Sequence, residues 1–148
     1  MFVLYALWSP IAWLIAFVLM LVVVLICLPV TLFVPFERLQ GGWPSRVIGW
    51  IPRLTLSRFT VRRDSAFDPK RTSVFVMNHT SMLDGHVAVA TLPHPFCGIE
   101  NAAHLHVPGY GWLMRMANAI PVYKDAAQRT EWLIDTARER AGRGISIL

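Results

Sequence analysis

The stretch that decides the fold is residues 73–91, which read SVFVMNHTSMLDGHVAVAT. Residues 73–77 are apolar and β-branched, which predicts a buried strand. Residues 78–81 are polar and interrupt that strand, and apolar residues then recur at helical spacing over residues 82–91. A strand followed directly by a helix places the side chains of the connecting turn at the carboxyl edge of a sheet, where α/β folds bind their ligands.

His79 and Asp84 are the side chains of this turn best suited to catalysis. A histidine can act as a general base because its ordinary pKa of about 6.5 is near working pH. A carboxylate on one imidazole nitrogen can orient the ring and stabilise the imidazolium. Residues five apart do not share a face of a regular helix, so the chain must turn between them, and Thr80 and Ser81 suit the cap of such a turn. The spacing also fits a simpler structure, in which Asp84 only stabilises a helix N-terminus and His79 is an ordinary junction residue.

Strands and helices alternate through the rest of the chain. Further strands are predicted at residues 59–63, 96–99, 119–123 and 145–148, and further helices at residues 110–117 and 126–141. This alternation predicts an α/β fold class.

The N-terminal segment has the composition of a membrane anchor. Residues 1–36 contain no charged side chain, and about 20 apolar residues suffice to cross the hydrocarbon core. Pro10, Pro29 and Pro35 predict interruptions, so the longest clean helix is expected over residues 11–28, as one crossing or as a kinked or re-entrant pair of helices. A secretory signal peptide fits poorly, because no Lys or Arg precedes the apolar run and no small-residue cleavage site follows it.

Basic charge is concentrated just after this anchor. The net charge is +5, and eight of the 14 Lys and Arg residues lie between positions 38 and 71. The side of the anchor that carries them is expected to face the cytoplasm. The block fits an anionic membrane surface and equally a solvated loop, and no nucleic-acid-binding module accompanies it, so no nucleic acid partner is expected. A short interfacial helix is predicted to start at Pro44 and to bend or end at Pro52.

Cysteine and histidine spacing bears on cofactors. Cys27 and Cys97 have neither metal nor redox spacing and are expected to be small apolar fillers. A metal-dependent hydrolase is a distant alternative, because several possible ligands are present: His79, Asp84, His86, His104 and His106. Metal sites need three or four converging ligands, and this spacing does not match the His-x-His-x-Asp-His run of the metallo-β-lactamase family, so we expect no metal and no cofactor.

Residues 78–84, Asn-His-Thr-Ser-Met-Leu-Asp, are similar to the first signature of the glycerophospholipid acyltransferases, the family of 1-acylglycerol-3-phosphate acyltransferases. Residues 104–112, HLHVPGYGW, resemble the segment before the family's second block. Residues 118–124, NAIPVYK, resemble that block itself, with Lys124 where the family usually carries arginine. The resemblance extends over nearly the whole chain.

The resemblance implies transfer of a fatty acyl group from acyl-CoA or acyl-carrier protein to the free hydroxyl of a lysophospholipid, with 1-acylglycerol-3-phosphate as the expected acceptor, in phospholipid synthesis at a membrane. His79 would be the general base and Asp84 the carboxylate that orients it. Lys124 would contact the phosphate as a point charge, although a solvated lysine at a strand end fits its position too. Asn78 and Ser81, which flank the histidine in the signature, complete the expected substrate site.

One departure concerns the family's third signature, Pro-Glu-Gly-Thr-Arg. It should follow the strand at residues 145–148, where the sequence stops. We therefore expect an α/β domain that is incomplete at its C-terminus, and a non-enzymatic membrane-anchored fragment or a defective paralogue stays open as an alternative. The expected organisation is a membrane anchor (1–36), a basic interfacial linker (37–57) and the N-terminal part of an acyltransferase domain (58–148).

Overall fold

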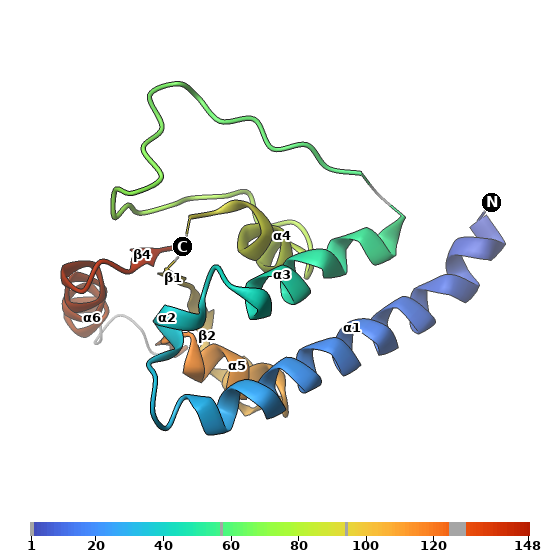
Figure 1. Cartoon of the computed structure of the whole chain (residues 1–148), viewed down its shortest axis with the longest axis horizontal. Coiled ribbons are helices and arrows are strands. Elements are labelled where there is room, and N and C mark those ends of the chain that lie inside the picture. Colours follow the sequence, from blue (N-terminus) through green and yellow to red (C-terminus); the bar gives the residue numbers. More distant parts are fainter. Residues whose placement is uncertain (1, 57, 94, 125–129) are drawn as a thin grey trace.

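A computed structural model (Figure 1) describes every residue of the chain except 1, 57, 94 and 125–129. The chain combines a long apolar N-terminal helix with a region of shorter helices and short parallel strands. In Figure 1 the long helix runs along one side of that region, with the N-terminus at its far end.

The N-terminal helix α1 is continuous over Phe2–Val30. The prediction that prolines would leave only residues 11–28 as a clean helix is wrong, since Pro10 and Pro29 both lie inside α1. A proline removes one backbone hydrogen bond, and the neighbouring turns of an apolar helix can absorb that loss. Pro29 lies in the last turn, so little helix follows it, and Pro35 comes only after α1 has ended.

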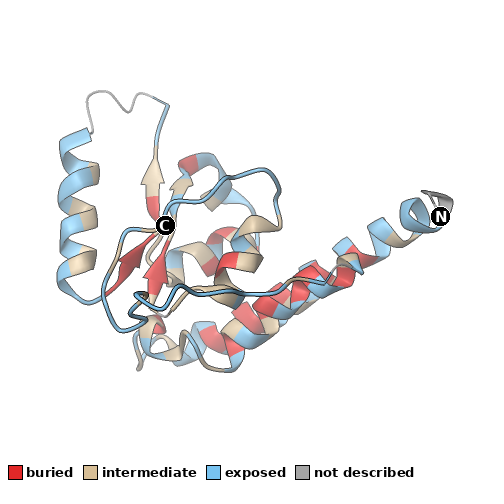
Figure 2. Cartoon of the chain, turned by 90° about the horizontal axis from the view of Figure 1, so that it is seen from above, coloured by how far each residue is buried: buried red, intermediate tan, exposed pale blue. Residues whose placement is uncertain are grey.

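The two sides of α1 have different surroundings (Figure 2). One side is buried against the helices that follow in the chain, and Val23 and Val24 there are 0% exposed. The other side is apolar and exposed, and includes Leu4, Leu7, Ile11, Leu14, Val18 and Leu25. The 27 residues of Leu4–Val30 are long and apolar enough to cross a membrane, for which about 20 are needed. α1 is therefore a candidate membrane span and also part of the protein core.

Short helical segments follow α1. After α2 (Phe36–Leu39), α3 covers Trp43–Trp50 with Pro44 in its first turn, and the 3-10 helix η1 (Ile51–Thr55) contains Pro52. The helix predicted between Pro44 and Pro52 is therefore present as α3. A proline fits the first turn of a helix and disrupts its interior, which is why the α-helix starts at the first proline and ends before the second.

The short strands are all parallel. β1 (Phe96–Cys97) pairs with β4 (Ser146–Ile147), and β2 (Ile99–Asn101) pairs with β3 (Ile120–Val122). The strand predicted at residues 96–99 is present but is split at Gly98 into two segments with different partners. The strands predicted at residues 119–123 and 145–148 are also present, as β3 and β4.

Helices connect these strands. α4 (Asp84–Thr91) precedes β1, the 3-10 helix η2 (Ala102–His106) and α5 (Tyr110–Met116) lie between β2 and β3, and α6 (Thr130–Gly142) precedes β4. The three α-helices are those predicted, although residues 126–129 of the last prediction lie outside the described residues.

A small core lies between the strands and α6. Its buried members come from β1, β3 and the segment around β4, and they are Cys97, Ile120, Ile145 and Ile147. Leu133 and Ala137 of α6 pack against this core, as predicted for the apolar side of the helix, whereas Ile134 is exposed. Both cysteines are free thiols in buried positions, as expected for apolar fillers.

Two strands predicted upstream do not form. Residues 59–63 join no ladder within the described part of the chain. Residues 73–77 contribute one parallel bridge, between Val74 and Ile147, and Val74 and Val76 are 74% and 93% exposed. A β-branched composition favours a strand, but a strand also needs a ladder partner and a covered face, and β4 offers only one residue of pairing here.

The helix that begins at Asp84 is positioned by α3. A Cβ built on Gly49 of α3 would lie 2.9 Å from Ala90 Cα and 3.0 Å from Ala90 Cβ on α4. Carbon atoms in contact are normally about 3.5–4.0 Å apart, so a glycine is required where these helices cross. Since α3 also packs on α1, the long helix and α4 belong to one packed unit.

Gly49→Val should destabilise the protein by about 1–3 kcal/mol, the usual cost of overpacking, because the added side chain would push α3 and α4 apart. Thermal unfolding in detergent micelles measures the change. Gly142→Ala is the matched control, since a Cβ at that position meets nothing within 4 Å, and it should not lower stability. Equal unfolding temperatures for Gly49→Val and the parent would contradict the close crossing of the two helices.

Candidate active site

The imidazole of His79 contacts the carboxylate of Asp84. His79 Nδ1 lies 2.9 Å from Asp84 Oδ2. The His79 side chain is 76% exposed, and the Asp84 side chain only 15%. α4 begins at Asp84 and the residues before it form a turn, so the chain bends between the two residues as the five-residue separation requires. The structure therefore brings the predicted pair together.

The same carboxylate oxygen also closes the turn. Asp84 Oδ2 accepts hydrogen bonds from the amides of Thr80, at 2.6 Å, and Ser81, at 2.8 Å. The backbone amides of Ser81 and Thr80, followed by the hydrogen bond and charge of His79, lower the pKa of Asp84, since hydrogen bonds to a carboxylate favour its ionised form. Asp84 is therefore an anion at neutral pH that holds the turn and the imidazole together.

This arrangement selects one tautomer of His79. An ionised carboxylate can only accept hydrogen bonds, so the Nδ1 atom of His79, 2.9 Å away, must carry the proton. In the neutral imidazole Nε2 then has a free lone pair. Because the side chain is mostly exposed, this nitrogen can reach a group that approaches from outside and can accept a proton from it.

Ser81 and Asn78, the two residues predicted to bind substrate beside His79, differ in their surroundings. Ser81 Oγ accepts a hydrogen bond from the Leu83 amide at 3.1 Å, so this hydroxyl helps to build the turn. Asn78 is exposed directly before His79. A contact of either side chain with substrate stays a prediction.

Lys124 lies apart from the pair. It is exposed just after β3, at the carboxyl edge of the strands from which the turn at His79 also leaves. The pairings run from Val74 through β4, then β1 and β2, to β3. Three strand spacings therefore separate Val74 from β3, which is about 14 Å at roughly 4.8 Å per spacing. The structure places Lys124 on the same edge without bringing it to His79.

A second pair of histidine and carboxylate was not predicted from the sequence. His104 Nδ1 lies 2.6 Å from Glu100 Oε1, and the Tyr110 hydroxyl donates to Glu100 Oε2 at 2.6 Å. Burial and the neighbouring Glu100 carboxylate raise the pKa of Tyr110, so its hydroxyl stays protonated. The four-residue spacing of Glu100 and His104 was no clear signal, because this spacing brings side chains together on a helix, whereas Glu100 lies in β2 and His104 in η2. These contacts tie η2 to α5.

The other described histidines belong to no cluster of possible metal ligands. Within the described residues, no three side chains of His, Cys, Asp and Glu converge on one point. His86 Nδ1 is buried without a hydrogen-bond partner in the described part of the chain, and its ring bonds the Met82 carbonyl. His106 is exposed. The described residues therefore offer no ligand set for a metal-dependent hydrolase.

Comparison with protein families gives a match to this region. A family model described as Acyltransferase matches residues 58–148, which is more than half of the chain and includes the turn that joins His79 to Asp84. No curated protein and no solved structure matches the chain.

His86 should make stability depend on pH. Burial lowers its pKa below the ordinary value of 6.5, so the unfolded chain binds a proton that the folded chain does not. The free energy of unfolding should therefore be greatest above about pH 6.5 and fall as pH decreases towards the folded-state pKa. Thermal unfolding at about pH 7.5 and pH 5.5 measures the effect, and His86→Gln should reduce the difference.

His106→Gln is the control, because His106 is exposed and its replacement should leave the difference unchanged. If His86→Gln and the parent lose the same stability between the two pH values, the imidazole of His86 is not the group responsible.

Proposed function

Because the chain belongs to the acyltransferase family, we propose that it transfers a fatty acyl group from a thioester donor, acyl-CoA or acyl-carrier protein, to the free hydroxyl of a lysophospholipid. The observation that carries this proposal is the 2.9 Å contact between His79 Nδ1 and Asp84 Oδ2, on a turn held by two backbone amides. It supports a role for His79 as general base and for Asp84 as its orienting carboxylate.

The proposed reaction is a single acyl transfer. His79 Nε2 takes the proton from the acceptor hydroxyl while that oxygen forms a bond to the thioester carbonyl carbon. The tetrahedral intermediate then breaks its carbon–sulfur bond, and the imidazolium returns the proton to the leaving thiolate. Asp84 stabilises the imidazolium between these steps, because an anion beside Nδ1 favours the charged ring. No serine or cysteine nucleophile takes part.

Phosphate recognition supports the choice of 1-acylglycerol-3-phosphate as acceptor in phospholipid synthesis. Lys124 supplies an exposed cation at the carboxyl edge that His79 also occupies, and an ammonium can bind a phosphate as a point charge. Asn78 and Ser81 complete the proposed acceptor site around the histidine.

The proposed setting of the reaction is a membrane surface. α1 is long and apolar enough to cross a membrane, and every Lys and Arg residue follows it in the sequence. Basic residues favour the cytoplasmic side, so we propose that residues 58–148, which we assign to the glycerol-phosphate-acyltransferase type of α/β domain, face the cytoplasm. Residues 1–36 then form the anchor, and residues 37–57 form a basic linker at the interface.

His79→Ala should lower kcat/KM for acyl transfer to 1-acylglycerol-3-phosphate by about 10²–10⁴-fold, the usual contribution of a general base. Asp84→Asn should also lower it, because an amide can donate to Nδ1 and so select the other tautomer of His79. Membranes that contain the protein, incubated with labelled acyl-CoA, provide the assay.

His106→Ala is the matched control, because His106 is also an exposed histidine but lies outside the candidate active site. The activity of this variant should equal that of the parent protein. Unchanged transfer in His79→Ala, at equal protein levels, would overturn the proposed role of this residue. Loss of activity in both histidine variants would point to a general defect in folding.

A further inference from the structure

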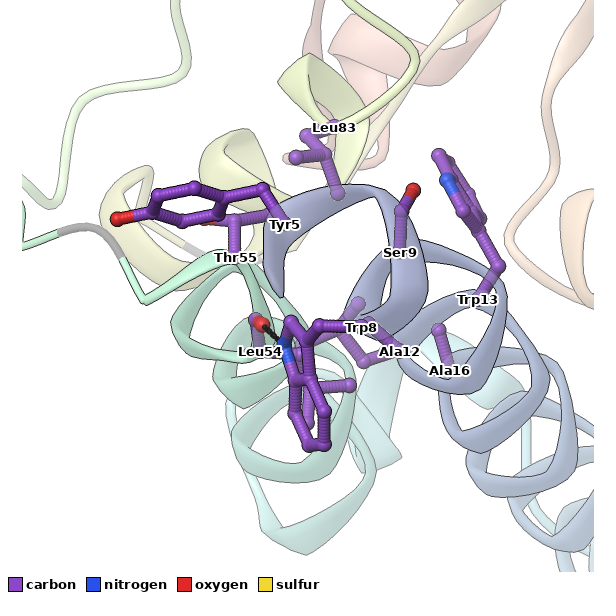
Figure 3. Close-up of a pocket in the computed structure, with 10 residues that line it drawn as sticks. Tyr5, Trp8, Ser9, Ala12, Trp13, Ala16, Leu54, Thr55 and Leu83 are labelled. Carbon is purple, nitrogen blue, oxygen red and sulfur yellow. Dashed lines mark hydrogen bonds between the residues drawn. The ribbon is translucent and has the colours of Figure 1, made fainter. Parts of the chain in front are cut away.

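A pocket lies between the first half of α1 and η1, next to the turn that carries the His79–Asp84 pair (Figure 3). Its volume is about 220 Å³. Pockets that enclose a whole drug-sized ligand usually measure about 300–1,000 Å³, so this one has room for part of a long molecule. From Tyr5 to Ala16, the lining of α1 extends about 16 Å along the helix axis at 1.5 Å per residue.

Two polar side chains of the pocket lining are hydrogen-bonded to backbone carbonyls of η1. The indole nitrogen of Trp8 donates to the Leu54 carbonyl at 2.6 Å, as Figure 3 shows, and the Thr55 hydroxyl donates to the Pro52 carbonyl at 2.7 Å. The Tyr5 hydroxyl is directed away from the other side chains drawn in Figure 3. What remains facing the pocket is mainly aromatic and aliphatic carbon, which favours an apolar guest.

Small side chains on α1 leave this space open. Ala12 and Ala16 line the pocket and are 9% and 6% exposed. They are four residues apart, so they lie on the same face of the helix one turn from each other. Ser9 lines the same face and is exposed. Larger residues at these positions would reduce the volume of the pocket.

The turn of the candidate active site contributes to the pocket lining. Leu83 lines the pocket and directly precedes Asp84 in the chain. The Leu83 amide donates to Ser81 Oγ, and the Asp84 amide donates to the Ser81 carbonyl at 3.1 Å. The side chain in the pocket and the carboxylate that holds His79 are thus fixed by the same turn.

The pocket opens beside the candidate membrane helix. Tyr5 and Trp13, which line it, are 47% and 45% exposed. Since α1 is the helix long and apolar enough to cross a membrane, a lipid chain that lies against this side of α1 can enter the pocket.

From these observations, and on the basis of the proposed function, we propose that this pocket holds part of the acyl chain of the lysophospholipid acceptor, and that Ala12 and Ala16 set the chain length it accepts. We assign the pocket to the acyl chain of the acceptor, and not to that of the donor, because the acceptor already resides in the bilayer. A donor carried by coenzyme A or a carrier protein approaches from water.

The first test compares acceptors of different chain length with one fixed donor. Ala12→Leu and Ala16→Leu should each lower the ratio of kcat/KM for a long-chain to a short-chain lysophosphatidic acid by about tenfold, which corresponds to roughly two methylene groups kept out of an apolar pocket. Ser9→Leu, at an exposed position, repeats the test if a buried substitution prevents folding. Ala6→Leu on α1, outside the pocket lining, is the control and should leave the ratio unchanged.

An unchanged ratio in all three pocket variants would overturn the proposal. A shift that follows the length of the donor chain, with the acceptor held constant, would overturn the assignment to the acceptor and place the donor chain in the pocket.

The second test does not depend on turnover, so it separates this proposal from the proposed function. A lysophosphatidic acid with a photoreactive group at the end of its chain is irradiated with membranes that contain the His79→Ala protein, and the labelled peptides are identified by mass spectrometry. Labelling should centre on the α1 peptide around Ala12 and Ala16, and Ala12→Leu should reduce it about tenfold while Ala6→Leu does not. Equal labelling of Ala12→Leu and Ala6→Leu would contradict the proposal that the pocket holds the acyl chain of the acceptor, whatever the activity of the protein.

Discussion

One carboxylate oxygen holds the candidate active site together. Asp84 Oδ2 accepts three hydrogen bonds, from His79 Nδ1 and from the amides of Thr80 and Ser81. These bonds keep Asp84 ionised, and an ionised Asp84 in turn keeps the proton of the imidazole on Nδ1. The turn, the charge and the tautomer therefore depend on one another, and the loss of the carboxylate would affect all three.

The long helix and the candidate active site belong to one packed structure. α1 contacts η1 through the bond from Trp8 to the Leu54 carbonyl, α3 packs on α1, and Gly49 of α3 lets α4 approach closely enough to set the position of Asp84. In the proposed function, the helix that anchors the protein in a membrane, α1, thereby also determines where His79 lies relative to the lipid. The pocket between α1 and η1 follows from the same packing.

The parts of the structure that the sequence predicted are those set by local pattern. The contact of His79 and Asp84 could be predicted because it is made within one turn, whose capping residues lie between the two partners. The failures concern information that is not local. Residues 73–77 have the composition of a strand, but their ladder partner is short. Pro10 looks like a break, although an apolar helix accommodates it. The contact of Glu100 with His104 depends on how the chain bends from β2 into η2, which the four-residue spacing alone does not set.

The central claim is that Asp84 holds the neutral imidazole of His79 with its proton on Nδ1 and its lone pair on Nε2. The ¹⁵N chemical shifts of the His79 ring, measured by NMR on selectively labelled protein in detergent at a pH where the ring is neutral, report this directly, because protonated and unprotonated ring nitrogens resonate far apart. The account predicts that the Nδ1–H tautomer dominates in the parent protein and loses that dominance in Asp84→Ala. A parent protein whose neutral ring carries its proton mainly on Nε2 would contradict the account, since the nitrogen left for the substrate could not then accept a proton.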